Sequence, residues 1–157
     1  WQVSAEEAHH TIETNLCGVY YGLDAILPTM LSQRSGGLAI VASAAGYIGL
    51  PNATLYGPTK AALINLAEVL YAELHGHGLG IYLINPGFVK SRLTALNAFK
   101  MPALITPEIA ARDILAGFAR GSFEIAFPLR FTRAVRLVSL LPYRISLGLL
   151  QRLARTS

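Results

Sequence analysis

Tyr56 and Lys60 form the pair of residues in this chain that is best suited to acid–base chemistry. They lie four positions apart in the run Tyr-Gly-Pro-Thr-Lys, so on a helix they share one face and the ammonium can lie beside the phenol oxygen. A free tyrosine ionises only near about pH 10, and a neighbouring cation favours its ionised form. The spacing therefore predicts that Tyr56 transfers a proton and that Lys60 tunes it.

Ser43 and Asn15 extend this pair into a candidate site. Ser43 precedes Tyr56 by thirteen residues, and Asn15 precedes Ser43 by twenty-eight. Ser43 ends the apolar run 38–43, which is typical of a buried strand, and Lys60 opens a helix-like run over 61–75. Because open α/β sheets bind ligands where their parallel strands end, we expect these polar groups at one edge of a sheet.

Each of these residues also has a purely structural interpretation. Ser43 could be a small residue that ends a strand, and Asn15 could be a polar residue within a helix that bonds to nearby backbone. Tyr56 and Lys60 could be an ordinary pair of helix neighbours. The four together favour chemistry over these alternatives.

Four stretches carry a resemblance to a known family, and they follow one another in that family's order across residues 1–125. They are Asn15–Gly18, Ser43–Gly46, Tyr56–Lys60 and Asn85–Ser91. The sequence resembles the short-chain dehydrogenase/reductase family. The resemblance implies an α/β fold, the C-terminal part of a Rossmann-type doubly wound parallel sheet with about three strands and flanking helices.

The resemblance also implies a role for each catalytic residue. Tyr56 would exchange a proton with the substrate oxygen, and Ser43 would hydrogen-bond that oxygen. Lys60 would bind the ribose hydroxyls of NAD or NADP as well as tune Tyr56, and Asn15 would support a water-mediated proton path to Lys60. The implied reaction is the interconversion of an alcohol and a carbonyl, with the hydride carried by the cofactor.

A second set of residues is implied to bind the cofactor. Pro86 and Gly87 would lie against the nicotinamide, and the Val89 backbone and Ser91 would lie near its carboxamide. Ser91 stands where the family more often has threonine. Together with Tyr56 and Lys60, these residues form the expected cofactor-binding set.

The chain begins at Trp1, in the middle of the family pattern, and lacks the glycine-rich phosphate-binding turn. We expect residues 1–157 to be the C-terminal portion of a single domain without its nucleotide-binding half, and to bind cofactor poorly alone. The run Gly76–Gly80 follows a helix and precedes a strand, which is the wrong order for a dinucleotide fingerprint. It is interpreted as a helix stop.

Composition bounds the remaining function classes. With 53% hydrophobic and 14% charged residues the chain can bury a core, and its single cysteine excludes an internal disulfide framework. The four histidines lack acidic or cysteine companions at ligand spacing, so no metal site is expected. We expect a cytoplasmic protein that acts on a small molecule.

Patterning predicts the elements that must position the site. A capping box at Ser4 and Glu7 begins a long helix that Pro28 should kink. The strand at 38–42 should be buried on both faces and should present an unpaired edge. The predicted helices are 5–33, 56–75 and 107–120, and the predicted strands are 38–42, 80–85 and 123–127.

Between Arg92 and Pro107 an apolar segment occupies the position of the family's substrate lid. Its apolar character favours a hydrophobic substrate, although inward packing would give the same pattern. By resemblance, the helices 5–33 and 56–75 would also pair with their copies in a homodimer or tetramer. The apolar residues of this segment are Leu93, Leu96, Phe99, Met101 and Leu104.

Residues 128–157 form two short basic, amphipathic helices that Pro142 separates. They contain six arginines and no acidic residue. Such helices fit either a terminal pair that covers the substrate pocket with a solvated basic face, or a weak peripheral contact with anionic lipid. The sequence alone favours the first interpretation, and without interleaved aromatics it argues against nucleic acid.

Two other function classes stay open at this stage. An epimerase or dehydratase of the same family would share Tyr56 and Lys60, although Ser43 and the Pro-Gly segment favour redox chemistry. A non-catalytic scaffold could keep the fold for dimerisation or membrane attachment, but the complete set of site residues argues against it.

Overall fold

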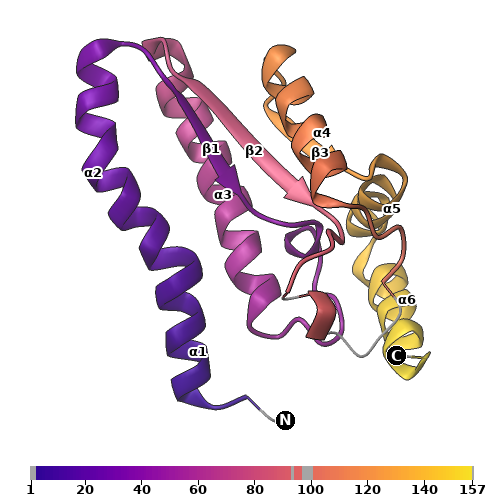
Figure 1. The fold of residues 1–157 in the computed structure, drawn as a ribbon. Coiled ribbons are helices and arrows are strands. Elements are labelled where there is room, and N and C mark those ends of the chain that lie inside the picture. The colour runs from indigo at the N-terminus through magenta and orange to yellow at the C-terminus, as the bar shows by residue number, and fades with distance from the viewer. Residues whose placement is uncertain (1–2, 93, 97–100, 157) are drawn as a thin grey trace.

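The core of the molecule is a three-stranded parallel sheet (Figure 1). The computed structural model describes residues 3–92, 94–96 and 101–156. The strands are β1 (Gly37–Val41), β2 (Gly80–Pro86) and β3 (Glu124–Phe127), in the order β1-β2-β3. The predicted α/β fold with a parallel sheet of about three strands is therefore confirmed.

The first long helix forms as predicted but contains a local irregularity. It consists of α1 (Ala5–Ile12), a π-helical turn (Glu13–Cys17) and α2 (Gly18–Gln33). Ser4 and Glu7 make both bonds of the expected capping box. Pro28 lies on the exposed side of α2 and does not end it.

The second long helix, α3 (Tyr56–Leu74), packs beside α2 on one face of the sheet (Figure 1). A 3₁₀ turn (His75–His77) and Gly78, at φ +84°, end it and lead into β2, as the helix-stop interpretation expected. Leu and Ile side chains of β1 and β2 point toward these helices. This core includes Leu23, Leu38, Ile40, Leu63, Leu66, Ala67, Leu70, Ile81 and Leu83.

The opposite face of the sheet is only partly covered. Helix α4 (Pro107–Ala119), capped by Thr106, packs on β2 and β3 and buries Ile84 and Ile125. It does not extend over β1, whose residues Gly37, Ala39 and Val41 are exposed, so β1 is buried on one face only. The prediction that this strand is buried on both faces is wrong for the chain as it stands.

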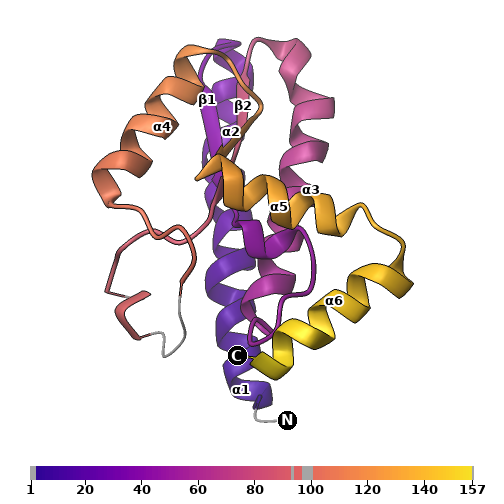
Figure 2. The same cartoon turned by 90° about the vertical axis from the view of Figure 1, so that its right-hand side faces the viewer.

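The last two helices form on either side of Pro142, as predicted. Helix α5 (Leu129–Ser139) packs on β3 and on the turn after β1, and α6 (Tyr143–Thr156) returns below it (Figure 2). Thr132 of α5 and Ser146 of α6 are both fully buried, so each helix has an inward face. Within the described ranges, no helix is long and apolar enough to cross a membrane.

Candidate active site

Ser43 lies where β1 ends. A 3₁₀ turn (Ala44–Gly46) follows it, and the Ser43 hydroxyl accepts a hydrogen bond from the backbone N–H of Ala45 at 3.1 Å. The same hydroxyl donates to the backbone carbonyl of Pro86 at 3.4 Å. The structure thus brings Ser43 together with the end of β2, which is the start of the predicted nicotinamide-binding segment.

Tyr56 is the first residue of α3, and Lys60 lies one turn further along. The Lys60 Nζ is 5.5 Å from the centre of the Tyr56 ring, and Tyr56 is 40% exposed. Lys60 donates a hydrogen bond to the backbone carbonyl of Val41 at 2.9 Å. Burial lowers the pKa of Lys60. The predicted shared face therefore exists, and it lies at the carboxyl end of β1.

Gly46 allows the turn after Ser43 to lie directly on α3. A Cβ at this position would stand only 2.7 Å from the backbone carbonyl carbon of Lys60. Any side chain here would push the turn and the helix apart. The close approach holds Ser43, at the start of the turn, near the helix that carries Tyr56 and Lys60.

Asn15 lies in the π-helical turn and reaches α3 through Thr59. The Asn15 Nδ2 donates to the Thr59 hydroxyl at 3.2 Å, and that hydroxyl donates to the Tyr56 carbonyl at 2.8 Å. Thr59, at 4% exposed, was not identified from the sequence. The sequence feature that could have identified Thr59 is its position directly before Lys60.

The segment predicted to bind the nicotinamide follows β2. The Gly87 N–H donates to the Phe127 carbonyl at 2.7 Å, and Val89 forms a parallel bridge with Ile105. The backbone N–H of Ser91 donates to the Thr94 hydroxyl at 2.8 Å. Ser91 is exposed, and its described hydrogen bonds are with Thr94 and Ala95 rather than with Ser43, Tyr56 or Lys60.

The predicted lid is described only in part. Leu93 and Phe99 lie outside the described residues, as does the side chain of Leu96. Met101 is half-buried, and Leu104 is 44% exposed.

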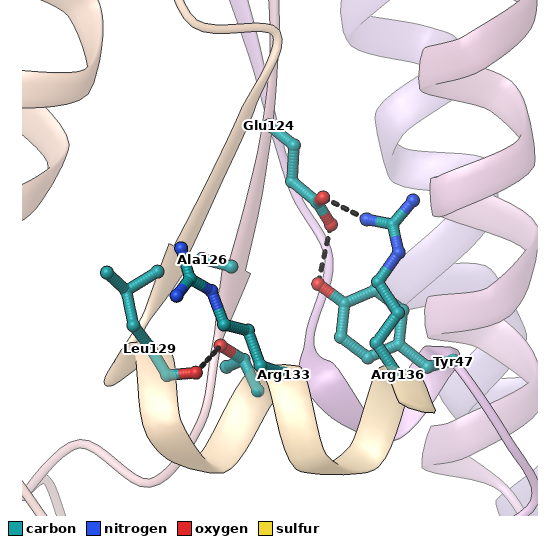
Figure 3. A pocket seen from close by; sticks show the side chains of 7 residues that line it. Tyr47, Glu124, Ala126, Leu129, Arg133 and Arg136 are labelled. Atoms are coloured by element: carbon teal, nitrogen blue, oxygen red, sulfur yellow. Dashed lines mark hydrogen bonds and ion pairs between the residues drawn. The ribbon is translucent and has the colours of Figure 1, made fainter. Parts of the chain in front are cut away.

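A polar cluster that sequence reasoning missed lies beside the turn that follows Ser43. It consists of Tyr47, Asn85, Glu124 and Arg136, and we refer to it as the Glu124 cluster. Figure 3 shows Tyr47, Glu124 and Arg136. The Tyr47 hydroxyl donates to Glu124 Oε1 at 2.5 Å, and Asn85 Nδ2 donates to the same oxygen at 2.8 Å. Arg136 forms an ion pair with Glu124, and its guanidinium lies 5.6 Å from the centre of the Tyr47 ring.

The Glu124 cluster ties four elements together: the turn after β1, β2, β3 and α5. Burial raises the pKa of Tyr47, and the bond to Glu124 and its negative charge raise it further. Asn85 is fully buried, and its Oδ1 has no hydrogen-bond partner among the described residues. The only sequence signal was that Glu124 is the last acidic residue before the arginine-rich tail.

A hollow of about 220 Å³ opens beside the Glu124 cluster. Its lining residues are Tyr47, Glu124, Ala126, Leu129, Thr132, Arg133 and Arg136. A hollow of about 490 Å³ is lined by Arg34 and residues 76–78, near the start of β1 and β2. The second hollow therefore lies at the opposite end of the sheet from Ser43 and Tyr56.

Comparison with known proteins identifies the family. The model of the short chain dehydrogenase family matches residues 2–100. An uncharacterized oxidoreductase of Myxococcus xanthus is 38% identical over 137 residues, which are 87% of this chain and 54% of that protein.

Solved structures show the same fold. A short-chain dehydrogenase from Sphingobium yanoikuyae, in complex with NADPH, matches with a TM-score of 0.75 and 20% identity, covering 90% of this chain and 59% of that one. A short chain dehydrogenase from Burkholderia cenocepacia, in complex with NADP, matches with a TM-score of 0.76 and 23% identity, covering 85% and 56%. The chain spans about half the length of these relatives. With the family model matching residues 2–100, the chain belongs to the short-chain dehydrogenase family.

Proposed function

We propose that the full-length protein is an NAD(P)-dependent oxidoreductase that interconverts an alcohol and a carbonyl. The observation that carries the proposal is the Tyr56–Lys60 pair, with 5.5 Å between the ammonium and the ring centre, at the carboxyl end of β1. A phenol beside a cation, at the edge where parallel sheets bind ligands, is suited to give a proton to a developing alkoxide.

Each residue has a separate task in this proposal. Tyr56, at 40% exposed, is accessible to a substrate and exchanges the proton at its hydroxyl oxygen. Ser43, on the neighbouring turn, exchanges its 3.4 Å hydrogen bond to the Pro86 carbonyl for one to the substrate oxygen and holds that oxygen in line with Tyr56. Asn15 donates to the Thr59 hydroxyl, and Thr59 in turn donates to the Tyr56 carbonyl, so the two residues hold the first turn of α3. A bound nicotinamide would supply or accept the hydride.

The residues present fit one end of a nicotinamide cofactor. Lys60 has three N–H donors, of which one is directed to the Val41 carbonyl, and the others suit a pair of ribose hydroxyls. Pro86 and Gly87 would lie against the nicotinamide, and Val89 and Ser91 near its carboxamide. This sequence holds no glycine-rich turn between a strand and a helix, so these residues account for the nicotinamide and ribose only.

An apolar substrate and a homo-oligomer are parts of the same proposal. Leu104, on the segment expected to close over the substrate, is 44% exposed and offers apolar surface. Helices α2 and α3 lie side by side (Figure 1) and expose large side chains that a second copy would cover. Those side chains are Tyr20, Tyr21, Ile26, Val69 and Tyr71.

The test is Tyr56→Phe in the full-length protein, assayed with a panel of aldehydes and ketones. Loss of the proton donor should lower kcat by at least about 100-fold, while the Kd for the nicotinamide cofactor stays within about twofold. Tyr82→Phe is the matched control, because Tyr82 of β2 packs against Phe118 of α4, and no contact described for it involves Ser43, Tyr56 or Lys60. Turnover that is equal in the two variants would refute the proposal.

A further inference from the structure

The turn that joins α5 to α6 exposes a run of large apolar side chains. We refer to residues 137–145 as the α5–α6 corner. Leu140 is 74% exposed and Tyr143 is 81% exposed, and Leu137, Leu141 and Ile145 are exposed by 64%, 37% and 52%. In Figure 2 this turn projects beyond α3 at the right-hand edge of the molecule. A projecting apolar corner of this kind marks a surface that another phase or molecule covers.

Positive charge accompanies the corner along both helices. Arg130, Arg133 and Arg136 lie on α5, and three more arginines on α6 are exposed as well. Residues 125–157 carry six arginines and no acidic residue, whereas the rest of the chain carries seven basic and nine acidic residues. The whole positive excess of the protein is therefore concentrated on the two helices that carry the exposed leucines.

The exposed apolar corner favours the lipid-contact interpretation of residues 128–157 over the interpretation as a pair of helices that only cover a pocket. Helices that only cover a pocket would direct their apolar residues inward, and Thr132 and Ser146 show that each helix already has a buried side. A second copy docked corner to corner would bring its own arginines close to those of the first, which costs electrostatic energy. An anionic membrane surface fits both the arginines and the apolar side chains, because its headgroups are negatively charged and the layer beneath them is apolar.

We infer that the α5–α6 corner docks the protein on an anionic lipid surface. Leu140, Tyr143 and their apolar neighbours insert into the headgroup layer, and the exposed arginines Arg130, Arg133 and Arg144 contact lipid phosphates. The contact is peripheral and reversible. It does not depend on the proposed catalytic function, because Asn15, Ser43, Tyr56, Lys60 and the segment 86–91 all lie outside α5 and α6.

Vesicle flotation with the full-length protein tests this inference. Neutral phosphatidylcholine vesicles are compared with vesicles that contain about one third phosphatidylglycerol. Binding should be confined to the anionic vesicles and should fall steeply as salt is raised, because screening weakens charge attraction. Removing one arginine, with Arg144→Gln, should weaken partitioning about fivefold.

A matched pair of leucine variants distinguishes insertion at the α5–α6 corner from nonspecific hydrophobic binding. Leu140→Ser should weaken binding about tenfold. Leu115→Ser, at a leucine on α4 that is 67% exposed, should leave binding unchanged. Equal binding to neutral vesicles, equal losses in the two leucine variants, or no binding at all would overturn the inference. It would also be overturned if sedimentation showed that Leu140→Ser dissociates a dimer, since a second copy would then cover the corner.

Discussion

Two tyrosines nine residues apart occupy opposite environments in this molecule. Tyr56 is exposed at the start of α3, beside the ammonium of Lys60. Tyr47 is half-buried, and its hydroxyl donates to the carboxylate of Glu124. Burial and the Glu124 carboxylate both favour the neutral phenol of Tyr47. Tyr47 is therefore suited to hold its proton, whereas the accessible Tyr56 is the tyrosine that we propose to exchange one.

The two surroundings also differ in how they are anchored. Tyr47 belongs to the Glu124 cluster, in which side chains from four elements bond to one another. Around Tyr56 and Lys60 the described hydrogen bonds go mainly to backbone carbonyls, those of Val41 and Tyr56 itself. Side-chain bonding holds the turn in place beside the site and leaves the reactive groups available to ligands.

The largest effect is expected when the cation beside Tyr56 is removed. Lys60→Met should lower kcat/KM by at least about 100-fold, because the proton donor loses its charged neighbour. Lys60→Arg keeps the charge but not the compact ammonium, and should recover only part of the activity. Steady-state rates and nicotinamide titration measure both effects, and thermal melts check that the fold is intact. Full activity in Lys60→Met would show that the cation beside Tyr56 has no role in catalysis.

The carboxylate of the Glu124 cluster should matter mainly for stability. Glu124→Gln keeps the shape but weakens the bonds to Tyr47 and Asn85 and removes the ion pair with Arg136. We expect a loss of about 1.5–3 kcal/mol in the free energy of unfolding, measured by urea denaturation. Glu73→Gln, at an exposed position on α3, is the control and should change stability by less than about 0.5 kcal/mol.

Tyr47→Phe should have a smaller effect that depends on pH. One hydrogen bond to a charged group is lost, so we expect about 1–2 kcal/mol at neutral pH. Because folding raises the pKa of Tyr47, the folded protein keeps a proton that the unfolded chain releases above about pH 10. This contribution to stability is complete below that pH and is lost as the pH rises beyond it.

Thermal melts between pH 8 and 11 therefore check the sign of this effect. The wild type should lose stability above about pH 10 more steeply than Tyr47→Phe. Tyr143→Phe, at a tyrosine that is 81% exposed, should follow the wild type. Parallel curves for all three proteins would show that Tyr47 does not hold its proton more tightly when folded.

The smallest effect is expected at Arg136. Its side chain is 53% exposed, and exposed ion pairs contribute less than about 1 kcal/mol. Arg136→Gln leaves the bonds from Tyr47 and Asn85 to Glu124 in place. Urea denaturation should show a loss below about 1 kcal/mol that shrinks further in high salt. A loss as large as that of Glu124→Gln would mean that the ion pair, and not the hydrogen bonds, holds the turn.

Local patterns predicted much of this fold. The capping box at Ser4, the helix that begins at Tyr56 and the break at Pro142 depend on residues close in sequence, and all three form where expected. The Tyr56–Lys60 contact was predictable for the same reason, since one helical turn joins the two residues.

Features that depend on distant residues were not predictable. The Glu124 cluster joins residues up to 89 positions apart, and no local pattern marks Tyr47 or Asn85 as partners of Glu124. The exposed face of β1 was missed because an apolar run shows that a strand can be buried, but not whether a helix covers it. The contact of Asn15 with Thr59 likewise depends on how two helices pack.

The π-helical turn at Glu13–Cys17 interrupts the regular α geometry of the first long helix. A π turn accommodates one residue more than the regular spiral, so deleting a single residue there would restore an unbroken α-helix. The segments α1 and α2 would keep their orientation, because the wide turn already absorbs the extra residue. Residues inside the turn would point in new directions, so a shortened chain could fold well yet place the Asn15 amide out of reach of Thr59.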